Sequence, residues 1–485
     1  MKLQALLKGI GVLETNAPMD MEITGVSYAS NTVQKGGMFV AVPGFATDGH
    51  RYIPDAVTRG ASVVLCEREM PADVPWVRVA SSREALAQLG VNWYGDPSAS
   101  MQVIGVTGTN GKTSVTYLLK ALLETALGAK VGLIGTICNM IGDRTLETER
   151  TTPESFALQG LLAQMREAGC THVVMEVSSH ALALHRVDGV RFRVGAFTNL
   201  TVDHLDFHGT MENYRDAKAQ LFRRCKEGVF DLDDKNTEYM MAQATCQCHT
   251  VGLRPEAELT ARDVSLGADH IAMTVCEGET CAALRLGIPG RFTVSNALVA
   301  LGIARTLGIA LAEAVQALSA AKGVKGRIEV VPTPGRDFTV LIDYAHTPDG
   351  LENVLRSVRD FCKGRILLVF GCGGDRDRSK RPQMGKIAAD NADLVFVTSD
   401  NPRTEQPMAI IEDILNGMKG AKTPFIVEEN RRLAIRSALR SAQKDDIVLL
   451  AGKGHETYQI LGTEKTHLDE REEVAAALCE MERSH

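Results

Sequence analysis

The stretch Val103–Thr113, V-I-G-V-T-G-T-N-G-K-T, decides the class of fold. Val103–Val106 has the composition of a buried strand, and Ser114–Ala126 continues with apolar residues at helical spacing. Between them, Gly108 and Gly111 allow a tight turn in which backbone N–H groups and the helix N-terminus face an anion. The stretch therefore predicts a strand, a phosphate-binding loop and a helix.

This loop departs from the strict pattern G-x4-G-K-[ST], because Val106 stands where the first glycine would be. An ordinary glycine turn before a helix is the alternative. The G-K-T core and its position between a strand and a helix favour nucleotide phosphates, which Lys112 would reach, and Mg²⁺, which the Thr113 hydroxyl would bind. The residues expected in the site are Thr107, Gly108, Thr109, Asn110, Gly111, Lys112 and Thr113.

Beyond this loop, strand-like runs such as His172–Val177 and Val194–Thr198 alternate with helical stretches. This alternation predicts an α/β fold with a mostly parallel central sheet. Cys246–Leu286 alternates more strictly and predicts an antiparallel addition, and Thr293–Leu307 predicts a helix.

Domain number follows from the length of 485 residues, which at about 150 residues per domain indicates three. The turn Gly95–Ser98 marks the first boundary, after the short strands Met38–Val42 and Ala61–Cys66 and the amphipathic segment Ser82–Tyr94. We expect domains at 1–98, 99–326 and 327–485.

Four buried strands are predicted in the third region, and each is followed directly by polar or glycine-rich residues. Ligands of open α/β sheets bind beyond the carboxyl ends of strands, so four such loops predict a shared site. The strands are Thr339–Ile342, Ile366–Phe370, Leu394–Thr398 and Ile447–Ala451.

Composition excludes several classes of protein. Apolar residues are 45% and charged residues 23%, as in soluble globular proteins, and the net charge of −7 argues against a general nucleic-acid or anionic-membrane binder. No apolar run approaches the roughly 20 residues that span a bilayer, and the N-terminus is a poor signal peptide. Eleven cysteines without a C-x2-C pair predict reduced, mostly buried thiols in a cytoplasmic protein.

Seven further motifs occur in a fixed order with the glycine loop. They are M-E-V-S-S-H (Met175–His180), F-T-N-L-T-V-D-H-L-D-F-H-G (Phe197–Gly209), Y-R-D-A-K (Tyr214–Lys218), D-Y-A-H-T-P (Asp343–Pro348), G-C-G-G-D-R-D (Gly371–Asp377), D-N-P-R (Asp400–Arg403) and G-K-G-H-E (Gly452–Glu456). With T-G-T-N-G-K-T, this set resembles the Mur ligase superfamily over the second and third regions, and more loosely over the first.

The resemblance implies three domains, with a P-loop-type central domain and a Rossmann-like C-terminal domain. It also implies ATP-dependent joining of meso-diaminopimelate to the D-glutamate of UDP-N-acetylmuramoyl-L-alanyl-D-glutamate through an acyl-phosphate, in peptidoglycan synthesis. Such an enzyme acts in the cytoplasm, and we expect a monomer whose partners are small molecules. Catalytic roles would fall to Lys112, Glu176, His204 and Lys218, and the Mg²⁺ ligands would be Thr113, Glu176, His204 and Lys218.

Lys218 has no special role on composition alone, since a lone helical lysine is usually solvated. In the family the matching lysine is carbamylated, which converts a cation into an anion able to bind Mg²⁺. The resemblance therefore implies carbamylation of Lys218.

The resemblance also assigns the remaining ATP contacts and the UDP-sugar contacts. For ATP these are Asn296, Arg327 and Asp343; for the UDP-sugar dipeptide they are Ser30, Thr151, Thr152, Ser178 and Arg186. The chain departs from the family pattern at Ala29–Asn31, where D-S-R is usual, at Arg150, where asparagine is common, and at Leu184, in place of glutamine.

Arg403 carries the most information about the amino acid that is added. Members that add meso-diaminopimelate carry D-N-P-R, and a guanidinium can hold the second carboxylate of this amino acid bidentately. The residues expected to bind it are Arg376, Asp400, Asn401, Pro402, Arg403, Gly452 and Glu456.

Two alternatives remain open. One is another amide ligase of the superfamily, such as an L-lysine-adding ligase or a folylpolyglutamate synthase. The other is a nucleotide switch, which would need no second ligand-binding domain.

Overall fold

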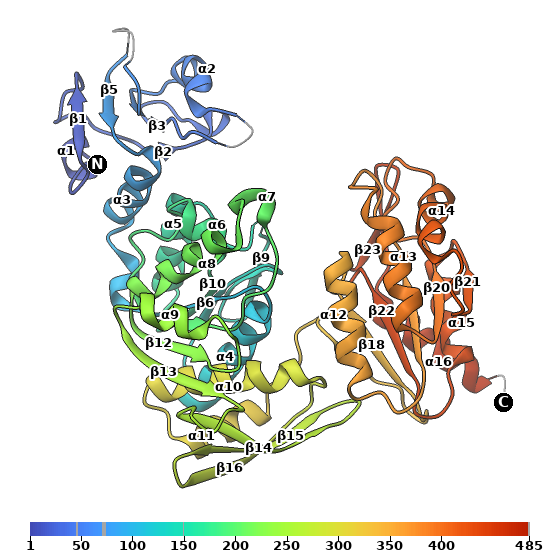
Figure 1. The fold of residues 1–485 in the computed structure, drawn as a ribbon. Coiled ribbons are helices and arrows are strands. Elements are labelled where there is room, and N and C mark those ends of the chain that lie inside the picture. The colour runs from blue at the N-terminus through green and yellow to red at the C-terminus, as the bar shows by residue number, and fades with distance from the viewer. Residues whose placement is uncertain (45–46, 70–73, 149, 484–485) are drawn as a thin grey trace. The chain divides into compact units, whose positions relative to one another are not determined.

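The computed structural model describes residues 1–44, 47–69, 74–148 and 150–483, and Figure 1 shows the course of the chain. Two compact units are present, each described by itself below. The first comprises Met1–Thr116 and Leu123–Thr250, and the second comprises Tyr117–Leu122 and Val251–His485.

The first unit begins with a small α/β sheet in the order β1-β5-β4-β3-β2, in which β1 alone is antiparallel. Helix α3 covers it and has clear end signals: Ser81 caps its first turn by accepting from Glu84 N, and Gly95 ends it at φ 72°. The elements are α1 (Leu3–Leu6), β1 (Val12–Thr15), β2 (Val26–Ser27), η1 (Ser30–Thr32), β3 (Met38–Val40), η2 (Gly49–Tyr52), α2 (Ile53–Thr58), β4 (Val63–Cys66), β5 (Trp76–Val79), α3 (Ser82–Tyr94) and η3 (Pro97–Ser100).

A larger sheet follows, and in this unit its order is β13-β12-β11-β6-β10-β7-β8-β9. Strands β12, β11, β6, β10 and β7 are parallel, and β8 and β9 extend the sheet as an antiparallel edge. The elements are β6 (Gln102–Thr107), α4 (Lys112–Leu127), β7 (Val131–Ile134), β8 (Asn139–Ile141), β9 (Arg144–Leu146), α5 (Ser155–Glu167), β10 (His172–Glu176), α6 (Ser179–Ala183), β11 (Phe192–Phe197), α7 (Leu205–His208), α8 (Met211–Ala219), η4 (Gln220–Arg223), β12 (Cys225–Asp231), α9 (Thr237–Gln243) and β13 (Gln247–Gly252).

The second unit opens with an antiparallel meander, β14 (Leu259–Leu266), β15 (Ile271–Glu277) and β16 (Thr280–Leu286), followed by α10 (Arg291–Thr306) and α11 (Leu311–Ser319). The expected antiparallel addition is thus present, although β13 pairs with β14 in parallel. Cys276 and Cys281 face each other in the β15–β16 register and form a disulfide. The expectation that every thiol is reduced is therefore wrong for this pair, because the hairpin brings the two residues to a Cα–Cα distance of 4.2 Å.

A six-stranded sheet in the order β17-β18-β22-β19-β20-β21 forms the rest of this unit. Helices α12, α13 and α14 pack on one face and α15 and α16 on the other, which is the doubly wound arrangement (Figure 1). The elements are β17 (Glu329–Val331), β18 (Thr339–Asp343), α12 (Pro348–Arg359), β19 (Ile366–Phe370), α13 (Lys380–Asn391), β20 (Leu394–Val397), α14 (Pro407–Met418), β21 (Phe425–Val427), α15 (Arg431–Ser441), β22 (Ile447–Ala451), β23 (Tyr458–Leu461), β24 (Glu464–His467) and α16 (Glu470–Arg483).

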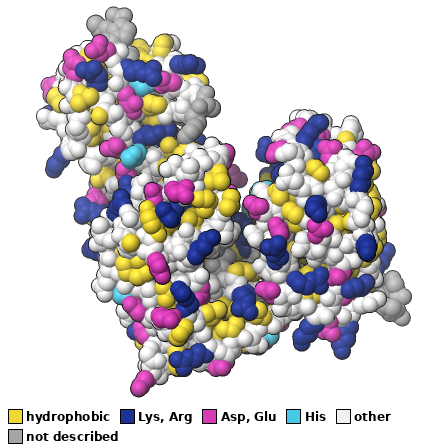
Figure 2. All heavy atoms as spheres, viewed as in Figure 1, with side chains coloured by type: hydrophobic (Ala, Val, Ile, Leu, Met, Phe, Trp, Pro, Cys, Tyr) yellow, Lys and Arg dark blue, Asp and Glu magenta, His cyan; other side chains and the backbone are white. Residues whose placement is uncertain are grey.

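The predicted fold class is confirmed: the chain is α/β, with three sheet-containing regions and a parallel central sheet. On the face seen in Figure 2, basic and acidic side chains are interspersed. Among the described residues, no helix is long and apolar enough to cross a membrane.

Candidate active site

The glycine loop joins β6 to α4, as the sequence predicts. Gly108 has φ 150°, and a Cβ atom there would lie 1.9 Å from Thr198 Oγ1, so no other residue fits. Lys112 Nζ donates to the carbonyl oxygens of Gly108 and Thr109, both at 2.8 Å. Lys112 thus stabilises the turn of the loop by hydrogen bonds to two of its carbonyl oxygens.

Residues that follow β11 hold this loop from the neighbouring strand. Asn110 N donates to Asn199 Oδ1 at 2.9 Å, and the Thr198 hydroxyl donates to the Asn110 carbonyl oxygen at 2.6 Å. Both partners lie in a motif quoted above, but no local pattern indicates their contact with the loop.

A buried carboxylate lies beside the loop at the end of β10. Glu176 is 1% exposed, and its Oε1 accepts from the Thr113 hydroxyl at 2.9 Å. Thr136, which lies outside every motif quoted above, donates to both carboxylate oxygens, through its amide at 2.9 Å and its hydroxyl at 3.0 Å. This orients two hard oxygen donors, Thr113 and Glu176, of the kind that Mg²⁺ prefers.

Lys218 is fully buried on α8, and its Nζ donates to the Gly108 carbonyl oxygen at 2.8 Å. The ammonium lies 4.5 Å from the centre of the Tyr214 ring. Burial, and next the positive charge of Lys112, hold the pKa of Lys218 well below its ordinary value of 10.5. The side chain is therefore a poorly solvated amine rather than a surface cation.

His204 lies near Tyr214, which contacts Lys218: its ring centre is 6.2 Å from that of Tyr214 and 4.8 Å from that of His180, and its backbone φ is 52°. Among the described residues, no group of three or more His, Cys, Asp or Glu side chains is placed to hold a metal ion. The expected Mg²⁺ set contains only two such residues, Glu176 and His204, and relies on a carboxylate formed on Lys218.

Four of the five expected UDP-sugar residues are linked through one network. The Thr152 hydroxyl donates to the Glu176 carbonyl oxygen at 2.9 Å and accepts from Ser178 N at 3.3 Å. Arg186 Nη1 donates to the Thr152 carbonyl oxygen at 3.4 Å, and Thr151 shares a hydroxyl–hydroxyl bond of 3.0 Å with Thr136.

Ser30, the fifth of these residues, belongs to η1, and its hydroxyl donates to Asp55, lowering the pKa of that carboxyl. At one departure from the family pattern, Arg150 forms an ion pair of 2.7 Å with Glu154. Glu154 also pairs with Arg186 at 2.8 Å, so the arginine at position 150 competes for the carboxylate that holds Arg186.

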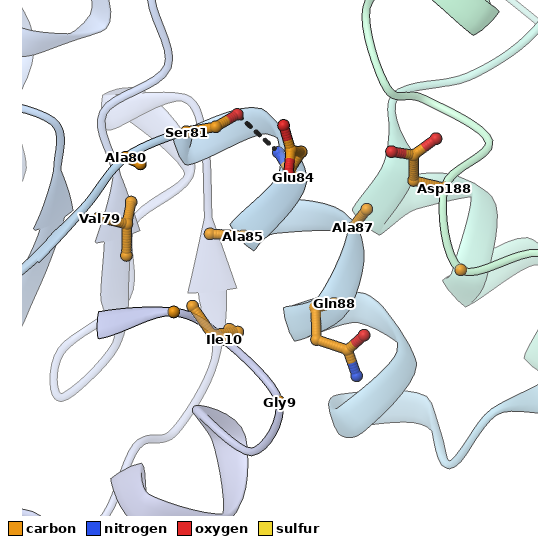
Figure 3. Close-up of a pocket in the computed structure, with 12 residues that line it drawn as sticks. Gly9, Ile10, Val79, Ala80, Ser81, Glu84, Ala85, Ala87, Gln88 and Asp188 are labelled. Carbon is orange, nitrogen blue, oxygen red and sulfur yellow. Dashed lines mark hydrogen bonds between the residues drawn. The ribbon is translucent and has the colours of Figure 1, made fainter. Parts of the chain in front are cut away.

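A cavity of about 350 Å³ lies in the first unit, but it contains none of the expected site residues. Its walls are Gly9–Gly11, Val79–Ser81, one face of α3 and Asp188–Gly189. Figure 3 shows Glu84 and Asp188 on opposite sides of it. Two carboxylates repel a diphosphate, so this cavity does not suit a nucleotide-sugar.

The expected adenine and ribose residues lie in the second unit. Asn296 is 5% exposed on α10. Asp343 ends β18, where its oxygens accept from Ile328 N at 2.8 Å and Ala345 N at 2.9 Å. Burial raises the pKa of Asp343, while the nearby Arg327 guanidinium opposes the shift.

The four loops predicted to share a site in the third region do follow four neighbouring parallel strands, β18, β22, β19 and β20. D-N-P-R and G-K-G-H-E are joined directly: Asn401 Nδ2 donates to Glu456 Oε2 at 2.9 Å. Gly452 has φ 114°, and a Cβ atom there would lie 3.7 Å from Asp400 Oδ2.

Lys453 fixes these two loops, although it is not among the residues expected to bind a ligand. It is fully buried, and its Nζ donates to Asn401 Oδ1 at 3.0 Å and to the Tyr458 carbonyl oxygen at 2.7 Å. It also lies 3.2 Å from Asp400 Oδ1 and 3.4 Å from Glu456 Oε2. The quoted G-K-G-H-E motif was the available signal.

Arg403 directs its guanidinium toward the loop after β19. Nη1 donates to the Gly374 carbonyl oxygen at 2.8 Å and lies 3.0 Å from the position of a Cβ atom on Gly373. Its backbone is left-handed, at φ 53°, which is uncommon outside glycine and marks a constrained position. Arg376, on the same loop, is exposed, and its Nη1 donates to the Asp375 carbonyl oxygen at 3.4 Å.

Comparison with known proteins agrees with this geometry. Residues 22–94 match the model of the Mur ligase family, catalytic domain; residues 106–304 match the Mur ligase middle domain; and residues 326–454 match the Mur ligase, glutamate ligase domain. A solved UDP-N-acetylmuramoyl-L-alanyl-D-glutamate--2,6-diaminopimelate ligase superposes with a TM-score of 0.74 at 31% identity over 99% of both chains.

Curated relatives cover the chain from end to end. UDP-N-acetylmuramoyl-L-alanyl-D-glutamate--2,6-diaminopimelate ligase from Caldanaerobacter subterraneus subsp. tengcongensis is 47% identical over 100% of both chains. The protein of the same name from Clostridium tetani is 43% identical over 99% of this chain and 100% of its own. With three matching domain models and full-length relatives, the chain belongs to the Mur ligase family.

Proposed function

We propose that this chain joins meso-diaminopimelate to the D-glutamate carboxylate of UDP-N-acetylmuramoyl-L-alanyl-D-glutamate, with ATP converted to ADP and phosphate. The proposal rests on the hydrogen bond between Asn401 and Glu456, which joins the D-N-P-R loop to the G-K-G-H-E loop. Full-length relatives at 47% and 43% identity bear the name of this activity.

The chemistry requires activation of a carboxylate, because its oxygen is a poor leaving group. We propose that ATP phosphorylates the D-glutamate carboxylate and that the amine of diaminopimelate then attacks the acyl-phosphate and releases phosphate. Phosphoryl transfer depends mainly on positioning and charge neutralisation. In the first unit, Lys112 and the amides of the glycine loop are suited to hold the phosphates.

The donors beside the loop fit Mg²⁺. Thr113 and Glu176 supply hard oxygens, and we propose that carbamylated Lys218 and His204 complete the set. Bound Mg²⁺ would neutralise charge on the phosphates. Carbamylation needs a neutral amine as the nucleophile toward CO₂, and the burial that lowers the Lys218 pKa favours that form.

The substrate assignments rest on the same family resemblance and full-length relatives. We propose that Thr151, Thr152, Ser178 and Arg186, with Ser30, contact the UDP-sugar dipeptide, and that Asn296, Arg327 and Asp343 contact ATP. Because ATP and a nucleotide-sugar are the substrates, we place the reaction in the cytoplasm, and we expect a monomer.

Recognition of diaminopimelate is assigned to Arg403 and Arg376, which suit its distal carboxylate, and to Glu456, which suits its ammonium. Asp400, Asn401, Pro402 and Gly452 would shape the site. L-Lysine lacks the distal carboxylate and would leave Arg403 without that partner. In sites built for a polar group, such a loss gives discrimination against the wrong substrate on the order of 10⁴-fold.

The test is amino-acid-dependent phosphate release by the purified chain with ATP, Mg²⁺ and UDP-N-acetylmuramoyl-L-alanyl-D-glutamate. We expect release with meso-diaminopimelate and little with L-lysine. Equal turnover of L-lysine would instead support a lysine-adding ligase. Release with a folate and glutamate would support the folylpolyglutamate alternative, for which a solved Mycobacterium tuberculosis synthase shares the fold at 19% identity and a TM-score of 0.60.

A further inference from the structure

Three arginines converge on one carboxylate in the first unit. Glu154 is the N-cap residue of α5, where the helix N-terminus stabilises negative charge, and its side chain is 15% exposed. Its Oε1 accepts from Arg150 Nη1 at 2.7 Å and lies 2.8 Å from Arg186 Nε, and its Oε2 lies 3.7 Å from Arg83 Nη1. One carboxylate thus faces three guanidinium groups, so this cluster of four side chains has a net positive charge.

Arg186 is the innermost of the three arginines, and its hydrogen-bonding capacity is largely unused. Its side chain is 14% exposed, and its buried Nε makes no hydrogen bond among the described residues, although Glu154 Oε1 is near. Its Nη1 donates to the Thr152 carbonyl oxygen at the long distance of 3.4 Å. A buried donor without an acceptor is costly, so this guanidinium is suited to receive an anion.

Arg150 accounts for the weak hold of Glu154 on Arg186. It lies four residues before Glu154 and donates a well-formed hydrogen bond to the same oxygen that Arg186 Nε approaches. Burial lowers the pKa of Arg186, and although Glu154 opposes this shift, the charges of Arg150 and Arg83 add to it. Arg150, with 53% of its side chain exposed, therefore draws the counter-ion away from the buried arginine.

Thr152 connects this cluster to the candidate active site. Its carbonyl oxygen accepts from Arg186, and its hydroxyl donates to the carbonyl oxygen of Glu176, whose carboxylate lies beside the glycine loop. The D-glutamyl residue of the proposed substrate has two carboxylates, of which one is phosphorylated and the other stays charged. Since the diphosphate is at the far end of this substrate, the charged carboxylate is the anion that fits near Arg186.

We propose that Arg150 is a positioning residue for the UDP-sugar dipeptide: by engaging Glu154, it leaves Arg186 available for the D-glutamate carboxylate that is not phosphorylated. This inference rests on the proposed function. Arg150 acts through Glu154 and does not itself contact the substrate. Its effect on substrate binding therefore depends on the charge of Glu154, which distinguishes it from a residue that attracts the substrate directly.

The experiment measures the Kd of UDP-N-acetylmuramoyl-L-alanyl-D-glutamate for the full chain by isothermal titration calorimetry without ATP, so that binding is separated from turnover. The proteins are the native chain, Arg150→Gln, Glu154→Gln and the double variant. Arg150→Gln should raise the Kd about tenfold when Glu154 is present and less than about twofold in the Glu154→Gln background. Arg144→Gln, which removes an exposed arginine of β9, is the control and should change the Kd less than about twofold.

The comparison of the two backgrounds decides the outcome, and circular dichroism verifies that each variant is folded. An equal rise in Kd in both backgrounds would mean that Arg150 attracts the substrate directly, and it would overturn the proposal. An unchanged Kd in Arg150→Gln would also overturn it, while leaving the proposed function intact. A native chain that does not bind the UDP-sugar dipeptide would contradict the proposed function and this inference together.

Discussion

Lys453 and Asn401 are joined by a hydrogen bond of 3.0 Å in which the donor is a lysine with no exposed surface. The same ammonium lies within 3.4 Å of carboxylate oxygens of Asp400 and Glu456. A buried cation of this kind holds two loops that the chain separates by about fifty residues, and it touches none of the atoms expected to react. Its role is therefore positioning.

Replacing Lys453 with Met removes the cation and leaves two carboxylates uncompensated. We expect the KM for meso-diaminopimelate to rise about tenfold or more while the KM for ATP changes less than about twofold, and the free energy of unfolding to fall by about 3–5 kcal/mol. Steady-state kinetics and urea denaturation measure both. Lys386→Met, at an exposed lysine of the same sheet region, is the control, and a uniform rise in every KM would contradict positioning.

Arg403→Ala tests recognition of the distal carboxylate. Alanine keeps a Cβ atom at the same left-handed position, so the backbone strain is unchanged and the guanidinium alone is removed. We expect kcat/KM for meso-diaminopimelate to fall by about 10²–10³-fold, while acyl-phosphate formation, trapped with hydroxylamine, changes little. Arg378→Ala, at an arginine 69% exposed, should lose little. An equal loss in both half-reactions would argue for damage to the fold.

Lys218→Ala should abolish most of the activity, because no carbamate can form. Acetate or bicarbonate, entering the space left by the side chain, should restore part of the activity by supplying a carboxylate. Phosphate release with and without acetate is the measurement, and Lys235→Ala, at an exposed lysine, is the control. Full activity of Lys218→Ala without any added carboxylate would sink the assignment.

Glu405 predicts a defined acid sensitivity. Hydrogen bonds from the Arg381 guanidinium lower the pKa of Glu405 from 4.5 to about 2. A lowered folded-state pKa contributes stability that is present above pH 4.5 and is lost as the pH falls toward 2. The difference in unfolding free energy between the native chain and Glu405→Gln should therefore shrink over this interval in urea titrations. Glu412→Gln, at an exposed glutamate, should show no such trend, and a difference independent of pH would contradict the linkage.

Two fully buried strands could be predicted from the sequence to the residue. β19 and β22 coincide with the predicted Ile366–Phe370 and Ile447–Ala451, because strands buried on both faces are continuous apolar runs. β21 could not be predicted, since Phe425–Val427 is exposed at the sheet edge and is formed by pairing with β20. The Cys276–Cys281 disulfide likewise depends on a hairpin register that composition does not contain.

Site residues could be predicted where one motif contains them, and their partners could not. The glycine loop could be predicted because its strand, turn and helix are contiguous in the sequence. Thr198 and Asn199 reach it only because β11 is the neighbour of β6, a strand order that no local pattern specifies. Thr136 contacts Glu176 for a similar reason: it follows β7, and β7 pairs with β10, the strand that ends at Glu176.

The Gly108 carbonyl oxygen accepts from both Lys112 and Lys218, each at 2.8 Å. Because the two amines share one acceptor, a reaction at Lys218 and the binding of phosphate at Lys112 are thermodynamically coupled. If Lys218 becomes an anion, Lys112 loses a like-charged neighbour and gains an attractive one, and phosphate drawn to Lys112 alters the affinity of Lys218 for CO₂ by the same factor. Dissolved carbon dioxide would then act as an effector of nucleotide binding, through an atom that belongs to neither ligand.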